Sequence, residues 1–529
     1  MTSYPRVRPV GDAAVTVEFG DTIDRRLNSA VRALDRLLAE RPLPGIIETV
    51  PTYRSLLVCF DPGRASFAAM TEALLDGATL DGPVLPLGSL RTIPTVYGGE
   101  HGPDLAEVAK ACGLGEAEVV RLHVSQEFTA LMLGFLPGFA YLGLLPEALS
   151  LPRRATPRPR VPGGSVGIAG RQTGVYPSAS PGGWHLIGHT SARMFDAFAE
   201  APTFIQPGNR VRFAQVHELP NDNRMTTPAG AGANPSVEVI VPGLVTTIQA
   251  GPRRGRRRLG VGAAGPLDAP AHAAANRAVG NALTDAALEV TLIGPTLRFL
   301  TSTRVAIAGA DLGAVLARSD LGDWPVPLGQ AFLARPGNVL RFRGRRAGCR
   351  AYVGFAGGID VPIVLGSRST DLTGGFGGHA GRALLEGDLL SVERGGGGRA
   401  FDPTPLPDLD DGITTLRVVM GPQQDHFARE VRQSFLEETY SVTAASDRVG
   451  CRLNGRAIAA LGSSEIVSDG MVPGCIQVPP DGQPIVMLAD GPTTGGYPKI
   501  ATVVTADLGR LAQLVPGEGR VRFEGVDPP

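Results

Sequence analysis

Residues 472–498 read V-P-G-C-I-Q-V-P-P-D-G-Q-P-I-V-M-L-A-D-G-P-T-T-G-G-Y-P, and Lys499, one of only two lysines in the chain, follows directly. An earlier stretch, residues 161–177, reads V-P-G-G-S-V-G-I-A-G-R-Q-T-G-V-Y-P. Both begin with Val-Pro-Gly, alternate small and β-branched residues as strands do, and end on Thr-Gly-x-Tyr-Pro. The repetition predicts one β-rich unit used at least twice, with the two stretches in equivalent places.

The end of the later stretch, residues 494–498, combines glycine and proline and so cannot lie inside a helix. Adjacent glycines let the backbone turn with positive φ and let a ligand approach the main chain closely. A tight hairpin turn that binds nothing needs the same residues, so one such loop alone does not indicate a site. Its recurrence, together with the adjacent Lys499, favours a binding site in the later copy.

Bulk composition narrows the class of protein. The length of 529 residues predicts about three or four domains. The 70 glycines and 45 prolines, with only 5% aromatic residues, favour many short strands and turns over long helices. A net charge of −1 argues against general attraction to nucleic acid or to membranes. Five cysteines without a C-x-x-C motif indicate a reduced, cytoplasmic compartment and no structural zinc, and we find neither a signal-peptide core nor a membrane-length apolar window.

The order of expected elements suggests an α+β domain followed by β-rich units. Residues 13–76 follow the order strand, helix, strand, strand, helix, which predicts a small ferredoxin-like domain that ends near Pro86. Pro-Gly followed by an alternating strand then recurs at residues 207–213, 336–342 and 516–523. This recurrence predicts three β-rich barrels or sheets of related design.

Two polar stretches rich in Pro and Gly, residues 218–236 and 395–412, are predicted linkers. They separate the chain into two halves and divide the second half again. The predicted domains are the ferredoxin-like unit 1–86, a barrel 87–217, a second barrel 237–394 and a third barrel 413–529.

Several short motifs have better structural explanations than catalytic ones. Gly163–Gly167 matches the hydrolase pattern G-x-S-x-G, but the two glycines and the proline in residues 168–177 exclude the helix that a nucleophile elbow requires. His185 and His189 form H-x-x-x-H without an acidic third ligand nearby, which favours two polar histidines on a barrel loop over a metal site. Neither lysine belongs to a Walker A motif or to a Met-Lys-Met-like turn, so the chain is expected to carry no biotin itself.

Polar residues that flank the glycine-rich turns late in the chain are the best candidates for chemistry. A lysine beside Gly-Gly-Tyr-Pro offers a compact charge for a phosphate or a carboxylate. An aspartate such as Asp469 is suited to orient water. Taken singly, each of these residues is explained equally well as an exposed polar residue of a turn. Taken together, they indicate a site more strongly than any one of them does. The set is Arg448, Asp469, Gln477, Asp490 and Lys499.

Longer motifs carry a family resemblance. The first 217 residues resemble the KipI-like family, also called allophanate hydrolase subunit 1-like, through residues 133–143 (L-G-F-L-P-G-F-A-Y-L-G), 161–177 and 181–188 (P-G-G-W-H-L-I-G). Residues 237–525 resemble the KipA-like, or subunit 2-like, family through residues 358–372 (G-I-D-V-P-I-V-L-G-S-R-S-T-D-L), 446–453 (S-D-R-V-G-C-R-L) and 472–502. Together the chain resembles a fusion of the B and C subunits of the ATP-dependent 5-oxoprolinase, and it is similar to the carboxyltransferase domain of urea carboxylase. The resemblance implies a mostly β fold with α+β parts, built from repeated cyclophilin-like β-barrels.

The resemblance implies opening of the 5-oxo-L-proline lactam to L-glutamate through phosphate activation, with ATP and Mg²⁺ as cofactors and no bound biotin. Such a reaction needs cations for phosphate and carboxylate, an acid or base near the water, and backbone donors for developing charge. The implied catalytic residues are Asp469, Lys499, Asp268 and Gln477. The implied substrate- or phosphate-binding residues are Arg448, Arg171, Thr494, Gly495, Gly496, Tyr497, Gly163, Gly164, His185 and Asp490; no protein-held metal is expected.

The implied partners are a LamB/YcsF-like protein, as the A component of the enzyme, and a small-molecule substrate. Nucleic acid and membrane are not expected, and homo-oligomerisation stays open. Two alternatives remain: a KipI/KipA-like regulator that binds a sensor histidine kinase, and a carboxyltransferase-like enzyme acting on a urea-type substrate with biotin supplied in trans.

The chain departs from the resemblance at three places. It has Ala250 in a stretch where relatives read Q-D-x-G-R, His189 where they tend to have Arg, and Gly491-Pro492 where they often have Arg-Gln.

Overall fold

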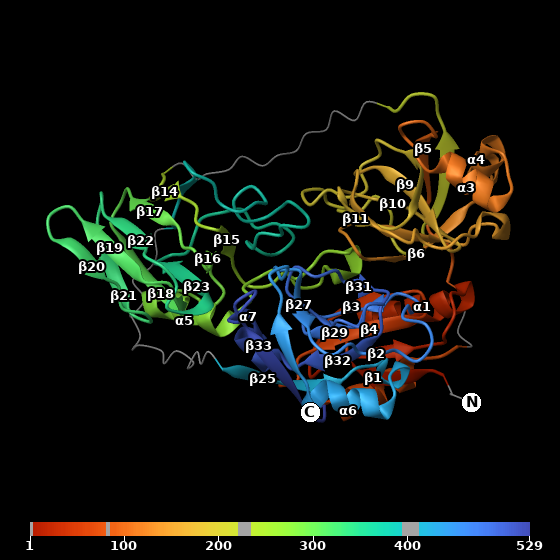
Figure 1. Cartoon of the computed structure of the whole chain (residues 1–529). Coiled ribbons are helices and arrows are strands. Elements are labelled where there is room, and N and C mark those ends of the chain that lie inside the picture. Colours follow the sequence, from red (N-terminus) through yellow and green to blue (C-terminus); the bar gives the residue numbers. More distant parts are fainter. Residues whose placement is uncertain (1–3, 81–84, 221–233, 394–411, 529) are drawn as a thin grey trace.

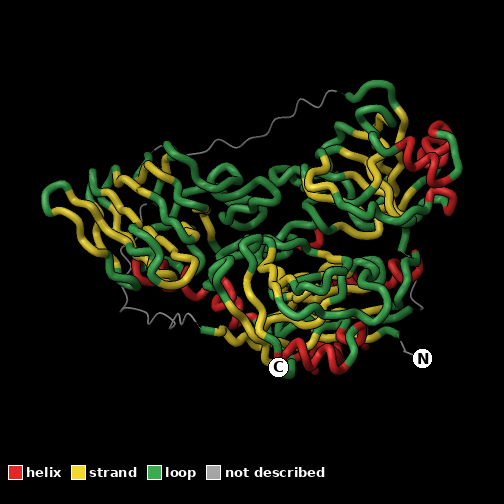
Figure 2. Tube along the Cα trace, viewed as in Figure 1, coloured by secondary structure: helices red, strands yellow, loops and turns green. Residues whose placement is uncertain are grey.

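The computed structural model describes residues 4–80, 85–220, 234–393 and 412–528. Strands and loops make up most of the chain, and the helices lie mainly at its periphery (Figure 2). The predicted mostly β architecture is therefore confirmed. The predicted linkers 218–236 and 395–412 fall largely outside the described residues.

The N-terminal unit is a four-stranded antiparallel sheet with two helices on one face. Its strand order is β1-β2-β4-β3, so the predicted strand–helix–strand–strand–helix series gains one edge strand from the start of the chain. Apolar residues such as Val17, Val31 and Leu74 form the core between sheet and helices. The elements are β1 Arg6–Pro9, β2 Ala14–Glu18, α1 Arg25–Glu40, β3 Ile46–Pro51, β4 Ser55–Phe60 and α2 Phe67–Gly77.

The next unit is a closed barrel of seven strands, here named barrel 1, in the order β10-β7-β6-β13-β5-β12-β9. Strands β5 and β13 run parallel, and the other neighbours are antiparallel. A two-stranded ribbon, β8 with β11, lies beside the barrel. The elements are β5 Leu90–Tyr97, α3 Leu105–Cys112, α4 Glu116–Val124, β6 Phe128–Leu133, β7 Ala140–Gly143, β8 Arg158–Val161, β9 Ser165–Ala169, β10 Gln172–Val175, β11 Ser180–Gly182, β12 His185–His189 and β13 Arg210–Gln215.

The C-terminal unit is a second closed barrel, here named barrel 2, in the order β25-β32-β29-β30-β27-β26-β33. Read from its parallel pair, this order matches barrel 1 strand for strand, with β25 in the place of β5 and β33 in the place of β13. It also has a matching ribbon, β28 with β31. The elements are β25 Ile413–Met420, α6 Arg429–Glu437, β26 Thr439–Val442, β27 Gly450–Asn454, β28 Asp469–Gly470, β29 Cys475–Gln477, β30 Ile485–Met487, β31 Thr494–Gly495, β32 Lys499–Val503, α7 Leu508–Ala512 and β33 Arg520–Gly525.

The predicted equivalence of the two opening stretches is right at one end and wrong at the other. Val-Pro-Gly leads into β9 in barrel 1 and into β29 in barrel 2, which are equivalent strands. Thr173, however, lies within β10, whereas Thr494 lies in β31, whose counterpart is β11. The strand pairs β12–β9 and β32–β29 both have a register shift at the same place, which leaves Ile187 of β12 and Ile500 of β32 without a register partner. The pair directly before each unpaired residue joins Leu186 to Gly167 and Lys499 to Gln477, so Leu186 is the barrel 1 counterpart of Lys499.

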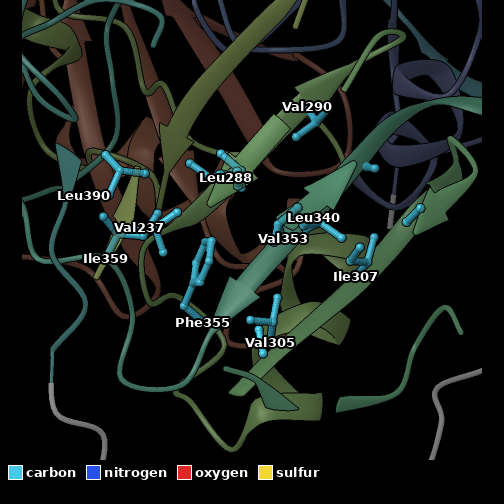
Figure 3. Close-up of a cluster of buried hydrophobic side chains, with 14 of the residues drawn as sticks. Val237, Leu288, Val290, Val305, Ile307, Leu340, Val353, Phe355, Ile359 and Leu390 are labelled. Carbon is cyan, nitrogen blue, oxygen red and sulfur yellow. The ribbon is translucent and has the colours of Figure 1, made fainter. Parts of the chain in front are cut away.

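The middle unit is not the closed barrel predicted for residues 237–394. It consists of a six-stranded sheet, β20-β19-β22-β17-β14-β24, and a five-stranded sheet, β15-β16-β23-β18-β21, with helix α5 (Ala269–Val279) on β18 and β23. Apolar side chains from both sheets, including Val237, Leu340 and Phe355, share one core (Figure 3). The strands are β14 Val237–Val241, β15 Val245–Gln249, β16 Ala287–Thr291, β17 Thr296–Phe299, β18 Thr303–Asp311, β19 Ala314–Arg318, β20 Gly322–Pro325, β21 Ala331–Ala334, β22 Val339–Phe342, β23 Ala347–Phe355 and β24 Leu389–Leu390.

The two ends of the chain pack together. Figure 1 shows the N-terminal sheet beside barrel 2. Barrel 1, at the upper right, and the middle unit, at the left, lie farther from each other. Leu57 and Cys59 of β4 share an apolar core with Met471, Cys475 and Met487 of barrel 2. The sheet thus buries one face against its own helices and the other against barrel 2, which joins the two halves of the chain.

Candidate functional site

The centre of the candidate site is a buried ion pair between Lys499 and Asp469. Lys499 begins β32, where Pro498 and the glycine-rich loop end, and Asp469 begins β28 of the ribbon. The Lys499 Nζ lies 3.4 Å from Asp469 Oδ2, and both side chains are almost fully buried, at 0% and 1% exposure. A buried pair of this kind is expensive to desolvate and is held only where further hydrogen bonds complete it.

Those further bonds come from three directions. The Ser55 hydroxyl donates to Asp469 Oδ1, and the Gly470 N–H donates to the same oxygen at 2.8 Å. The Gln423 amide donates to Asp469 Oδ2 at 3.2 Å, and its oxygen accepts from the Lys499 backbone N–H at 3.3 Å. Burial alone would raise the pKa of the Asp469 carboxyl, but the charges of Lys499 and Arg54 and these bonds outweigh it, so its pKa lies below the ordinary value.

Two of the groups around Asp469 belong to the N-terminal unit. Ser55 begins β4, and Arg54 precedes it and pairs with Glu18 at 3.1 Å. Burial lowers the pKa of the Arg54 guanidinium, but the charges of Asp469 and Glu18 outweigh it and raise the pKa. The site is therefore assembled across the contact between the first and last units of the chain.

The loop before Lys499 also meets barrel 1. The Phe135 N–H donates to Thr494 Oγ1 at 3.2 Å, and Thr494 also hydrogen-bonds the Tyr141 side chain, whose pKa burial raises to about 12. Gly134 permits this approach, because a Cβ there would lie 2.1 Å from Thr494 Oγ1. The two motif loops, residues 133–143 and 494–498, thus lie against each other.

The other candidates from this loop lie where the sequence places them. Gln477 faces Lys499 across the β29–β32 pair, and its amide donates to the Met487 sulfur at 3.1 Å. Gly495 packs tightly, since a Cβ there would lie 2.5 Å from Gln477 Oε1. Gly496 and Tyr497 are half-buried, and Gly496 O accepts from the Ile466 N–H at 2.9 Å. The loop therefore leads from a partly exposed turn to the buried Lys499.

Three other candidates belong to a different buried network, between the middle unit and barrel 2. Arg448 donates to both Asp490 oxygens, at 2.8 and 3.0 Å, and also to Glu289 of β16. The Arg448 and Arg350 charges hold the pKa of Glu289 below its ordinary value against the opposing effect of burial, whereas burial raises the pKa of Asp490 despite Arg448. No contact described for Arg448 or Asp490 reaches Lys499, so the single late-chain cluster expected from sequence divides into two.

Asp268, predicted to act in catalysis, caps helix α5. Its carboxylate accepts from the Ala271 N–H at 3.0 Å and from the Gln513 amide at 2.7 Å, and its own N–H donates to the Tyr352 hydroxyl. Tyr352 in turn donates to Glu289 at 2.8 Å. Burial raises the pKa of Asp268. These contacts place it in the Arg448 network and not beside Lys499.

The candidates in the first half lie within barrel 1. Arg171 is exposed and donates to Leu145 O at 3.2 Å. His185 lies on strand β12 and not on a loop as predicted, buried, with Nε2 3.0 Å from Pro152 O. Gly164 adopts φ +85°, and its N–H donates to Tyr176 O. This N–H is therefore not free to donate to negative charge that develops on a substrate. Gly163 packs against the Ser178 backbone. None of the contacts described for these residues reaches the Lys499–Asp469 pair.

Sequence reasoning missed Ser55, Gln423 and Glu289. Ser55 follows Thr52-Tyr53-Arg54, and Gln423 follows Gly421-Pro422, so each resembles an ordinary turn residue. A charged residue in the middle of a mostly apolar strand, such as Glu289 within Ala287–Thr291, is the one usable signal.

Neither a metal centre nor a membrane span is found in the described parts of the chain. Among these residues, no three His, Cys, Asp or Glu side chains gather closely enough to hold an ion. No helix within them is both long and apolar enough to cross a bilayer.

Two family models together match most of the chain. Residues 5–205 match the carboxyltransferase domain, subdomain C and D, and residues 259–525 match the carboxyltransferase domain, subdomain A and B. The chain belongs to the carboxyltransferase domain family. In this carboxyltransferase-domain protein, Ser55 comes from the C/D part, whereas Asp469 and Lys499 come from the A/B part.

Known relatives divide along the same line. The chain is 39% identical to the B subunit of 5-oxoprolinase from Bacillus subtilis, over 41% of this chain and 95% of that one. It is 37% identical to the C subunit of 5-oxoprolinase from Escherichia coli, over 53% and 89% respectively. Urea amidolyase of Lachancea kluyveri is 35% identical over 53% of this chain, but only 16% of that protein is matched.

A solved structure matches the whole arrangement. The crystal structure of TTHA0988 is 36% identical, covers 98% of this chain and 100% of its own, and superposes with a TM-score of 0.84. The predicted resemblance to fused B and C subunits is therefore confirmed as an arrangement.

Proposed function

We propose that this protein is the fused B and C component of an ATP-dependent 5-oxoprolinase, which opens the lactam of 5-oxo-L-proline to L-glutamate. Two observations carry the proposal: the two halves are similar to proteins named as the B and C subunits of that enzyme, and Ser55 of one half completes the Lys499–Asp469 pair of the other. An enzyme whose site is shared between two polypeptides needs both together, which fusion guarantees.

Lactam opening makes specific demands on this site. An unstrained amide resists attack by water, so its oxygen must be activated before the ring opens. Lys499 is the cation that would stabilise negative charge developing on that oxygen, and the Asp469 carboxylate holds the ammonium in place. Thr494 and the half-buried backbone of Gly495 and Gly496 would bind and orient the substrate next to it.

The chain's own residues do not fit an ATP–Mg²⁺ site. Neither Lys110 nor Lys499 follows a phosphate-binding loop, and the described residues include no cluster of three metal-ligating side chains. We therefore assign nucleotide binding to a partner and derive no step on ATP within this chain. The relatives are named as subunits, which supports the existence of further components, and we propose a LamB/YcsF-like protein in the cytoplasm as the A component.

The test is reconstitution. Purified chain with ATP, Mg²⁺ and 5-oxo-L-proline is expected to release little or no glutamate, and addition of the LamB/YcsF-like protein is expected to start release of glutamate and phosphate together. Full release without the partner would contradict the three-component proposal. No release with a partner shown to bind would favour the regulatory alternative, a KipI/KipA-like protein acting on a sensor histidine kinase.

A second candidate function follows from the family itself. Carboxyltransferase domains and the similarity to urea amidolyase favour carboxyl transfer to a urea-type substrate, with biotin supplied on a separate carrier. Incubation of the chain with a carboxylated biotin carrier and urea tests this candidate. Loss of the carboxyl group from the carrier only when urea is present would support it over lactam opening.

A further inference from the structure

A cavity of about 190 Å³ lies at a three-way junction away from the Lys499–Asp469 pair. Its walls come from the N-terminal sheet, from the arginine-rich loop 252–263 of the middle unit and from barrel 2. None of the residues that hold the Lys499–Asp469 pair lines it. The cavity therefore belongs to a separate place on the contact that joins the two halves.

Most of the cavity wall is apolar. Val10, Ile47 and Phe60 line it from the N-terminal sheet, and Pro473, Val503 and Leu508 line it from barrel 2. The volume exceeds that of one water, which occupies about 30 Å³ in the liquid. Such a lining suits a compact apolar body of several heavy atoms, with polar recognition supplied by a few side chains.

The charged groups of the wall leave one cation without a partner. The Asp12 carboxylate accepts from the Thr505 N–H at 3.0 Å and from its hydroxyl at 2.9 Å. Glu48 pairs with Arg257 at 3.1 Å. Arg254 is exposed and, within the described parts of the chain, forms no hydrogen bond or ion pair. Both acidic residues are thus already satisfied, and Arg254 offers its guanidinium to a ligand.

We propose that this cavity binds a small organic carboxylate with a compact apolar body, whose carboxylate pairs with Arg254. A guanidinium binds a carboxylate through two parallel N–H donors, which suits one anionic group at the cavity mouth. The neighbouring Arg253 is not an equivalent donor, because it is fully buried: Nε and Nη2 donate to Val364 O and Ser369 O, at 3.1 and 2.9 Å, and Nη1 lies 3.9 Å from the Asp371 carboxylate.

Occupancy of this cavity would reach the Lys499 site through the contact between the halves. A ligand that binds only when the N-terminal sheet is packed on barrel 2 stabilises that packing by mass action. The same packing brings Ser55 to Asp469. The ligand is therefore expected to stabilise the packing on which the shared site depends, a role that goes beyond the proposed lactam opening.

The test is calorimetric titration of the full chain with matched probes, without ATP or a partner. Cyclopentanecarboxylate is expected to bind, while cyclopentanecarboxamide, of the same shape without the charge, is expected to bind at least tenfold more weakly. Titrations with 5-oxo-L-proline and L-glutamate then show whether substrate or product is the better ligand. Equal binding of cyclopentanecarboxylate and cyclopentanecarboxamide would overturn the proposal. So would the absence of cyclopentanecarboxylate binding at millimolar concentration.

Two variants locate the site. Arg254→Gln is expected to weaken carboxylate binding about tenfold or more, as for loss of a charge-assisted hydrogen bond. Arg256→Gln is the matched control, since Arg256 is in the same loop but does not line the cavity. An equal loss in both variants, or no loss in Arg254→Gln, would contradict the assignment. Binding is measured without turnover, so failure to reconstitute lactam opening would not change the binding result. Failure of the carboxylate to bind would likewise not contradict the proposed lactam opening.

Discussion

Barrel 1 and barrel 2 share one strand order but place different side chains at one equivalent position. Leu186 of barrel 1 packs among aromatic residues, including Tyr176 and Trp184. Lys499 of barrel 2 pairs with Asp469, against which the N-terminal unit places Ser55. The same scaffold thus holds an apolar cluster in one copy and a shared polar site in the other, so the fold alone does not indicate function.

Their buried polar groups differ in the same way. In barrel 1, His123 lies between Tyr97 and Thr173, with ring nitrogens at 2.7 and 2.9 Å from the two hydroxyls. Burial lowers the pKa of His123 to about 3, so it is neutral at physiological pH. Barrel 2 instead retains two opposite charges. At the compared position barrel 1 therefore carries an apolar residue, whose backbone N–H donates to the buried Asp104 carboxylate at 2.7 Å, whereas barrel 2 carries the charged Lys499.

The largest effect on stability and turnover is expected when the charge at Lys499 is removed. Lys499→Met leaves Asp469 as a buried charge without its partner, which lowers the free energy of unfolding by about 3–5 kcal/mol. Turnover of the folded fraction is expected to fall tenfold or more. Leu186→Met at the equivalent position is the control and should cost less than about 1.5 kcal/mol. Urea denaturation measures both; equal losses would show that the charge is not what distinguishes the barrels.

The position of Lys499 after Gly-Gly-Tyr-Pro predicts that Lys499→Ala lowers turnover about tenfold or more and leaves the fold intact. Full burial of the side chain corrects the expectation of an intact fold, so activity must be compared per folded molecule.

A smaller effect is expected from the bond that joins the halves. Ser55→Ala removes one donor to Asp469 and should lower the free energy of unfolding by about 1–3 kcal/mol. Ser125→Ala is the control, because its exposed hydroxyl donates only to Leu122 O, and it should cost within about 0.5 kcal/mol. Chemical denaturation distinguishes them. A Ser55→Ala variant as stable as Ser125→Ala would mean that the contact between the halves does not depend on this bond.

Two buried carboxyls, Asp469 and Asp371, should contribute to the free energy of unfolding with opposite pH dependence. The pKa of Asp469 is lowered, so its ionisation contributes stability above about pH 3.9, which is lost as the pH falls through the folded-state pKa. Burial raises the pKa of Asp371 to about 6, so its contribution is present below about pH 3.9 and is lost as the pH rises through 6.

Asp371→Asn should therefore remove a decline in stability between about pH 4 and 6, on the order of 1 kcal/mol or more. Asp323→Asn, an exposed carboxylate paired with Arg343, is the control and should leave the decline in place. Urea unfolding measured at pH 4.5 and at pH 7 tests both variants. A decline that persists in Asp371→Asn would assign it to another group.

Local sequence signals predicted elements better than their assembly. Alternation and turn residues located strands such as β2, β4 and β33, and Val-Pro-Gly correctly related β9 to β29. The repeated Thr-Gly-x-Tyr-Pro misled, because glycine and proline are needed at many kinds of turn, here in β10 and in β31. The middle unit was predicted as a barrel because strand patterns are alike whether a sheet closes or packs on another.

The candidate site was predictable only in part for the same reason. Lys499, Asp469 and Gln477 lie close in sequence and meet in the structure. Ser55 lies more than four hundred residues away, and nothing local to it indicates that Asp469 is its partner. Arg448 and Asp490 flank the same turns but point to the middle unit, since Glu289 completes their pairing there.

The smallest effect is expected from an arginine of barrel 1, and it tests whether that barrel also contributes a charge to substrate binding. The sequence suggests Arg171 as a phosphate-binding residue, yet its guanidinium is exposed and donates to Leu145 O of its own barrel. Because an exposed arginine bonded to one carbonyl contributes little, Arg171→Ala should change the free energy of unfolding by no more than about 0.5 kcal/mol. Turnover in the reconstituted system should stay within about twofold, against the tenfold loss expected for Lys499→Met. A tenfold rise in KM for 5-oxo-L-proline with unchanged stability would instead place part of the substrate site on barrel 1.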